Sequence, residues 1–307
     1  MPVRYQKTIG GKVTFEGIGL HTGINSTLNI KPAKENNGII FKRVDLKDNP
    51  TIPADVKYVI NTNRGTVLER NGIRIYTVEH VLAALRGIGI DNADIDLAGP
   101  EPPILDGSAA AFVEAVKRVG IIDQDVIQGV YKVTEPIQLN DPNNGVELNI
   151  LPADQFKITF FMDYGLPNFG MQYASVENVE NEFAKEIAPA RTFGLLSEIA
   201  QLKQNGLIKG GGPENAIIIV DKKVNKQERN ILSKLFGLNT EIDIKNNSIL
   251  NDKALRFKNE PVRHKVLDLI GDMALLSKPL AGHIIATKSG HKMNIELVKK
   301  IRQKITI

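Results

Sequence analysis

The sequence contains no cysteine and only five histidines in 307 residues, so few groups are available for metal binding or nucleophilic chemistry. Without cysteine there can be no disulfide, no thiolate nucleophile, no iron–sulfur cluster and no cysteine-based zinc site. Any transition-metal site must therefore combine histidine with aspartate or glutamate. The five candidates are His21, His80, His264, His283 and His291.

Long apolar runs and targeting signals are also missing. No stretch approaches the roughly 18 apolar residues of a membrane span. The first twelve residues have neither the apolar core nor the cleavage pattern of a signal peptide. We therefore expect a soluble, cytoplasmic protein.

The charge excess is mild, at +4. No Lys/Arg run with interleaved aromatic residues predicts a nucleic-acid partner. The excess suits an anionic small substrate or transient proximity to an anionic membrane surface, and equally an ordinary solvated surface. Nothing in the sequence predicts an oligomeric state.

An internal repeat predicts two similar domains. KVTFEGIGL (12–20) resembles KVTEPIQL (132–139), and LNIKPA (28–33) resembles LNILPA (148–153), both pairs starting 120 residues apart. Their alternation of apolar and polar residues is typical of strands. Chance similarity between two hairpins is the alternative. Duplication is favoured because both short sequences recur in the same order and with the same 120-residue spacing.

The predicted fold class is α+β, with two similar α/β domains that each pack a sheet with helices. The first domain spans 1–126 and the second 127–307, with the junction in 120–129. Residues 221–256 are polar and rich in asparagine, and we interpret them as an inserted surface elaboration.

Apolar spacing predicts helices over 79–87, 108–120, 192–206 and 264–276. We expect Ser108 and Thr192 to act as N-caps, and Gly87 and Gly120 to end their helices. Short apolar runs predict strands over 91–99, 216–220 and 283–287.

His264 and Asp268 are four residues apart on a predicted helix, so both point to one face. Zinc ligands use this spacing, although such a pair is more often a solvated helix face. Asp272 lies one turn further along and Lys265 beside the pair. Gly271 counts against the solvated interpretation, because a glycine inside a helix permits close backbone approach.

Glu79 and His80 are adjacent at the start of an otherwise apolar helix. His80 could bind a metal while Glu79 takes a proton from water, but an ordinary first-turn glutamate is the plainer alternative. His291 follows a Ser-Gly turn after a buried strand, where loops often present catalytic groups. Read alone, His291 is an ordinary surface histidine.

Two further motifs are less specific. Thr192 in ARTFG could donate to a developing oxyanion. KGGGPEN (209–215) lacks the Lys-Ser/Thr of a P-loop, so a flexible or closely approached backbone is the simpler interpretation.

Taken together, six motifs resemble one enzyme family, the zinc-dependent UDP-3-O-acyl-N-acetylglucosamine deacetylases of lipid A biosynthesis. The motifs occur in family order and span nearly the whole chain: GLHTG (19–23), TVEHVLAAL (77–85), PILDGSA (103–109), ARTFG (190–194), VRHKVLDLIGD (262–272) and SGH (289–291). The resemblance implies a duplicated architecture with the active site in the cleft between the domains. It implies hydrolysis of the N-acetyl group of an acylated UDP-sugar, with release of acetate.

The resemblance also implies a role for each matched residue. One Zn²⁺ per chain would be held by His80, His264 and Asp268, leaving a position open for water. Glu79 would be the general base, and His291 the general acid or electrostatic partner of the intermediate. The remaining roles are orientation of that histidine by Asp272, oxyanion stabilisation by Thr192 and substrate binding by Lys265.

Further matched residues are implied to line the passage for the acyl chain: Phe193, Ile199, Ile208, Ala216 and Ile218. His21 would border the site, and His283 is left as a structural residue. Some family members with an insertion like 221–256 continue into a fused 3-hydroxyacyl-carrier-protein dehydratase, and this chain could be the deacetylase part of such a protein. The rival interpretations are a metallo-amidase for another N-acetyl sugar nucleotide and a non-catalytic sugar-nucleotide-binding protein.

Overall fold

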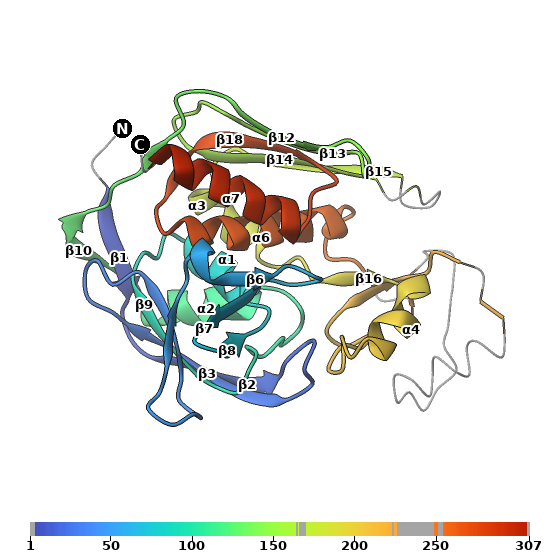
Figure 1. Cartoon of the computed structure of the whole chain (residues 1–307), viewed down its shortest axis with the longest axis horizontal. Coiled ribbons are helices and arrows are strands. Elements are labelled where there is room, and N and C mark those ends of the chain that lie inside the picture. The colour runs from blue at the N-terminus through green and yellow to red at the C-terminus, as the bar shows by residue number, and fades with distance from the viewer. Residues whose placement is uncertain are drawn as a thin grey trace.

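The computed structural model describes residues 4–163, 165, 170–222, 224, 225, 249, 250 and 254–305. Two mixed sheets lie on the outside and helices pack between them, which confirms the α+β prediction (Figure 1). The helices in contact at the centre are α1 (Glu79–Gly87) and α6 (Glu260–Met273).

The first sheet has the strand order β2-β3-β9-β4-β5. Strands β4 and β9 are parallel, and the other neighbours are antiparallel. The bounds are β2 (Val13–Ile18), β3 (Asn25–Pro32), β9 (Ala93–Ala98), β4 (Ile39–Arg43) and β5 (Thr51–Pro53). Helix α2 (Ala110–Val119) packs against β2 and α1.

The second sheet repeats this arrangement as β12-β13-β18-β14-β15, in which β14 and β18 are the parallel neighbours. Its strands are β12 (Ile137–Asp141), β13 (Val146–Leu151), β18 (Leu280–Thr287), β14 (Phe156–Asp163) and β15 (Met171–Val176), and β11 (Tyr131–Lys132) pairs with β18. Its helical segments are α3 (Val179–Glu182), η2 (Phe183–Ile187), α6, η4 (Ala274–Leu276) and α7 (His291–Ile305).

One of the two pairs of repeated words occupies equivalent places in the two sheets, with LNIKPA in β3 and LNILPA in β13. The other pair does not, because Val13 lies in β2 whereas Val133 lies before β12 and donates to the Ala281 carbonyl of β18. Ile30 of β3 pairs with Ile95, and Ile150 of β13 pairs with Ile284 of β18. All four side chains are fully buried. The division of the chain after residue 126 stays a prediction; the expected junction holds β10 (Ile121–Ile127), which pairs with β1 (Tyr5–Ile9).

Two small sheets border the central helices. One contains β6 (Val59–Asn61), β7 (Val67–Arg70) and β8 (Ile73–Ile75), preceded by η1 (Val56–Tyr58). The other pairs β16 (Phe193–Leu195) with β17 (Ile217–Ile219), and α4 (Leu196–Gln204) follows β16 directly.

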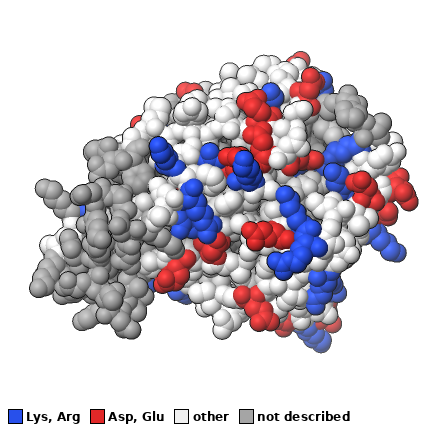
Figure 2. Space-filling model, turned by 180° about the vertical axis from the view of Figure 1, so that it is seen from behind, with Lys and Arg blue, Asp and Glu red and all other residues white. Residues whose placement is uncertain are grey.

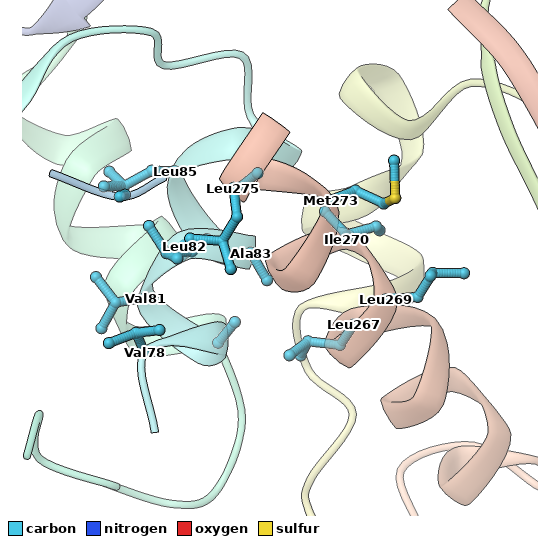
Figure 3. Packing of buried hydrophobic residues seen from close by; sticks show 14 of the residues in the cluster. Val78, Val81, Leu82, Ala83, Leu85, Leu267, Leu269, Ile270, Met273 and Leu275 are labelled. Atoms are coloured by element: carbon cyan, nitrogen blue, oxygen red, sulfur yellow. The ribbon is translucent and has the colours of Figure 1, made fainter. Parts of the chain in front are cut away.

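The core between the sheets is built on the contact of α1 with α6 (Figure 3). Leu82 and Ala83 of α1 and Leu267 and Ile270 of α6 are fully buried. Helix α1 is apolar around most of its circumference because neighbouring elements cover it on every side. Gly271 permits the closest approach, since a Cβ there would lie 2.2 Å from the Glu79 carbonyl oxygen.

The structure corrects two expected N-caps. Thr192 is not an N-cap: its backbone N–H donates to Gly107 and its carbonyl accepts from Ile217, so it extends the β16–β17 pairing, which replaces the first helical turn. Helix α2 begins at Ala110, although the Ser108 hydroxyl still accepts from the Ala110 N–H at 3.2 Å.

Helix α1 ends at Gly87, as expected, but this glycine does not adopt a left-handed conformation. A Cβ at Gly87 would meet the ring of Phe183 at 2.3 Å, so the glycine makes room for that ring. The left-handed conformation after α1 is adopted by Gly89, at φ +81°. Gly120 ends α2 at φ +89°, as expected.

Much of the expected insertion, namely residues 223, 226–248 and 251–253, lies outside the described residues. Within the rest, Ile249 and Leu250 are buried, and the interpretation of the segment as an inserted surface elaboration stays a prediction. Leu250 packs with Leu196, Ile199 and Ile218, because the apolar face formed by α4 and β17 needs a cover.

No helix among the described residues is long and apolar enough to cross a membrane. Acidic and basic side chains are interspersed over the face shown in Figure 2.

Candidate active site

A strained backbone conformation at Thr77 positions the first turn of helix α1. Thr77 has φ +51°, an uncommon conformation for a β-branched residue. Its hydroxyl donates to Glu101 at 2.6 Å, and the same buried carboxylate accepts from the backbone N–H groups of His21 and Thr22. Glu101 therefore stabilises the turn that positions Glu79 two residues later.

Three buried side chains form a potential metal site between α1 and α6. His80, His264 and Asp268 each offer one ligand atom, and these atoms all lie within 4.8 Å of one another. Asp268 Oδ1 is 3.3 Å from His264 Nε2 and 3.9 Å from His80 Nε2. Two imidazoles and one carboxylate are a ligand set found in catalytic zinc sites.

The hydrogen bonding of His264 fits a bound metal. His264 Nδ1 donates to the Ala190 carbonyl at 3.0 Å, which leaves the Nε2 lone pair directed at the cluster. His80 Nδ1 is buried and has no hydrogen-bond partner among the described residues. Such an unpaired nitrogen is costly, and a metal would remove the cost only by binding Nδ1 itself.

The electrostatics favour the protonation states that metal ligands need. Burial, together with the nearby charge of His264, lowers the pKa of His80 to about 3. Burial also lowers the pKa of His264. Burial opposes ionisation of Asp268, but the positive charges of Lys265 and His291 help to outweigh it and hold the pKa of Asp268 below its usual range. Neutral imidazoles and an ionised carboxylate result.

Glu79 and His291 lie beside this cluster, close to each other. Glu79 Oε2 accepts from the Thr66 N–H at 3.0 Å, and Glu79 Oε1 is 3.7 Å from His291 Nε2. Burial raises the pKa of Glu79 to about 7, which suits a general base near neutral pH.

His291 begins α7 and is oriented by Asp272. Its Nδ1 donates to Asp272 Oδ2 at 2.8 Å. Burial alone would lower the pKa of His291, but the negative charges of Asp272 and Glu79 raise it to about 10. His291 is therefore positively charged at neutral pH.

Sequence analysis missed two side chains that hold Asp272. The Thr66 hydroxyl donates to Asp272 Oδ1 at 2.6 Å, and Asn294 Nδ2 donates to Oδ2 at 2.8 Å. Asn294 lies three residues after His291, a helical spacing that could have revealed it. Nothing in the sequence around Thr66 indicates a partner more than 200 residues away.

The cluster opens into a pocket of about 470 Å³, lined by Glu79, His80, His264, Asp268 and His291 among others. Lys265 and Thr192 lie on its wall. Lys265 Nζ donates to Asp268 Oδ2 at 2.8 Å and lies 5.6 Å from the centre of the Phe193 ring.

A narrow apolar pocket of about 80 Å³ adjoins this one and shares Thr192 and Phe193 with it. All five residues expected for the acyl passage line it: Phe193, Ile199, Ile208, Ala216 and Ile218. His21 also lines it, with Nε2 donating to the Arg64 carbonyl at 3.1 Å and Nδ1 accepting from the Ile208 N–H. Burial lowers the pKa of His21. His283 is in β18 and contacts Thr159 of β14.

Comparison with known proteins decides which family combines these features. The sequence model of the UDP-3-O-acyl N-acetylglycosamine deacetylases, LpxC, matches residues 6–236 and 232–303. This chain belongs to the LpxC family. The resemblance inferred from the motifs is confirmed over nearly the whole chain.

Relatives of LpxC type occur alone and in longer proteins. The "Bifunctional enzyme LpxC/FabZ" of Chlorobaculum tepidum is 42% identical over 300 residues, covering 97% of this chain and 64% of that protein. The protein of that name from Bacteroides thetaiotaomicron is 39% identical, with 98% and 65% covered. The "UDP-3-O-acyl-N-acetylglucosamine deacetylase" of Geobacter sp. strain M21 is 39% identical, with 97% and 88% covered. The chain thus spans just under two thirds of the two bifunctional relatives.

Proposed function

We propose that this chain is a zinc-dependent deacetylase of lipid A biosynthesis. Its substrate would be UDP-3-O-(3-hydroxyacyl)-N-acetylglucosamine, hydrolysed to the 2-amino sugar nucleotide and acetate. One observation carries the proposal: a buried His80–His264–Asp268 cluster opens into a pocket between a base and a protonated histidine, in a chain of the LpxC family.

Zn²⁺ held by these three side chains would supply a Lewis acid that polarises the acetyl carbonyl and makes a neighbouring water more acidic. Glu79 accepts the proton of the attacking water, since it lines the pocket and titrates near neutral pH. Thr192 donates its hydroxyl to the oxyanion that develops on the former carbonyl oxygen.

His291 completes the reaction. An amine is a poor leaving group, so the sugar nitrogen must receive a proton as the C–N bond breaks. His291 carries that proton, because Asp272 and Glu79 keep its ring charged. Lys265 binds the substrate at the pocket wall and, in addition, neutralises Asp268.

The apolar pocket defines the substrate further. The acyl chain would enter between Phe193, Ile199 and Ile218, and each buried methylene group would contribute about 0.8 kcal/mol. His21 borders this passage as a neutral side chain.

Acetate release from the acylated sugar nucleotide tests the proposal. We expect turnover by protein that retains zinc, loss of turnover after chelation, recovery on zinc addition, and inhibition by a hydroxamate. Equal turnover of acylated and non-acylated substrates would instead support a metallo-amidase for another N-acetyl sugar nucleotide. Protein purified without chelator that contains no metal and binds the sugar nucleotide without turnover would support a binding protein.

The two bifunctional relatives support a further proposal, that this chain is the LpxC part of a fused protein whose second part is a 3-hydroxyacyl-carrier-protein dehydratase. The mass of the protein in its native cells, detected with an antibody against this chain, tests it. A location in the cytoplasm also stays a prediction.

A further inference from the structure

Thr66 is the one residue among those described that bonds both the proposed base and the carboxylate behind the proposed acid. Its backbone N–H donates to Glu79 Oε2 at 3.0 Å, and its hydroxyl donates to Asp272 Oδ1 at 2.6 Å. The residue is fully buried, so it does not face the pocket. Thr66 directly precedes β7, whereas Asp272 lies on α6.

Asp272 depends on Thr66 for its orientation. Its Oδ2 already accepts from His291 Nδ1 and from Asn294, and the Thr66 hydroxyl supplies the bond to Oδ1 in the described structure. The hydroxyl also lies 3.4 Å from His291 Nδ1, too far to compete with the 2.8 Å bond between His291 and Asp272. Removing the hydroxyl leaves Oδ1 buried and unsatisfied, so that only the two bonds to Oδ2 still orient the carboxylate.

We propose that Thr66 is a positioning residue that sets Glu79 and His291 at their working separation across the pocket. The expected change in kcat rests on the proposed function, but the geometry alone predicts that Thr66 orients Asp272. One rigid residue bonded to both sides keeps Glu79 Oε1 and His291 Nε2 3.7 Å apart. Groups that orient a catalytic side chain typically contribute 10- to 100-fold in activity.

Thr66→Val tests the inference, because valine keeps the shape and the backbone N–H but lacks the hydroxyl. We expect kcat to fall about 10- to 100-fold while KM and zinc content stay unchanged. Thr66→Ser should recover most of the loss. Thr8→Val is the matched control: Thr8 is also buried and its hydroxyl donates to the Asn92 carbonyl, but it lies in β1, away from the pocket. It should keep the wild-type kcat.

A double-mutant cycle distinguishes positioning from general destabilisation. If Thr66 acts through Asp272, Thr66→Val should cost little once Asp272→Asn has already removed the carboxylate. Equal losses of kcat in both backgrounds would overturn the inference, as would a wild-type kcat for Thr66→Val.

The resonance of the His291 Nδ1 proton provides a readout that needs no activity. We expect it downfield in the wild type and in Thr8→Val, where Asp272 accepts it, and shifted or exchange-broadened in Thr66→Val. A wild-type resonance in Thr66→Val would overturn the inference even if the chain proved to have another function. A shifted resonance in a chain that releases no acetate would support the positioning while contradicting the proposed reaction.

Discussion

Gly271 of α6 lies directly against the backbone of Glu79 in α1, so close that a Cβ on the glycine would be 2.2 Å from the Glu79 carbonyl oxygen. The contact is between backbones, so no side-chain rotation can relieve it. The metal cluster and the base are divided between these two helices, and this crossing point sets their separation.

Gly271→Ala should therefore damage both stability and activity. Forcing the helices apart in a filled core typically costs about 1–3 kcal/mol in the free energy of unfolding. We expect this loss in denaturant titrations, together with reduced zinc content and turnover. Gly129→Ala is the control, since a Cβ there meets nothing within 4 Å. Wild-type stability and zinc content in Gly271→Ala would show that the close approach is not required.

Different mutations should abolish metal binding and proton transfer separately. His264→Ala removes a ligand, so zinc and turnover should be lost together. Glu79→Gln retains the ligands but cannot accept a proton, so zinc should remain while kcat falls about 100-fold or more. Zinc analysis and kcat on the same preparations provide the comparison. His283→Ala, in β18, should change neither, and near-normal turnover by Glu79→Gln would remove Glu79 from its assigned role.

The pH dependence of kcat/KM should be bell-shaped. Glu79 acts in its ionised form, so activity should fall as the pH drops below the pKa of Glu79. This pKa is about 7, and a bound cation would lower it because the cation favours ionisation. His291 works as the charged ring, so activity should fall as pH rises through about 10. Asp272→Asn removes a negative charge that raises the pKa of His291, so the alkaline limb should move to lower pH. If the alkaline limb does not move in Asp272→Asn, that limb reports the titration of a group other than His291.

The apolar passage should control which acyl chains are accepted. Ala216 lines a space of only about 80 Å³, so Ala216→Leu should obstruct it. We expect kcat/KM for a long-chain substrate to fall about 10-fold or more, while a substrate without the chain is unaffected. Ala200→Leu, on the exposed face of α4, should change neither. Equal losses on both substrates would place Ala216 outside the passage.

Local sequence patterns predicted those parts of the fold that depend on neighbours in the chain. The apolar run containing Leu82 specified α1, and the spacing of His264 and Asp268 specified one face of α6. The repeated words identified β3 and β13, where Ile30 and Ile150 have equivalent partners. Each of these signals lies within one element or one hairpin.

Features that depend on distant segments could not be predicted in this way. Thr192 precedes an apolar run as an N-cap residue would, but its carbonyl accepts a hydrogen bond from the Ile217 N–H and extends the strand pairing. Thr66 directly precedes β7, and its partner Asp272 belongs to the other half of the chain. Glu101 likewise acts through a strained Thr77 that no local pattern reveals.

The β16–β17 pair has one more consequence. In the described part of the chain these two strands form a sheet of their own, separate from both large sheets. The residues proposed to line the acyl passage therefore belong to a layer that pairs with neither large sheet, although Thr192 bonds to Gly107 and Ile208 bonds to His21. Under the proposed function, substitutions in this layer can change the preferred chain length while Glu79 and the three candidate metal ligands stay the same.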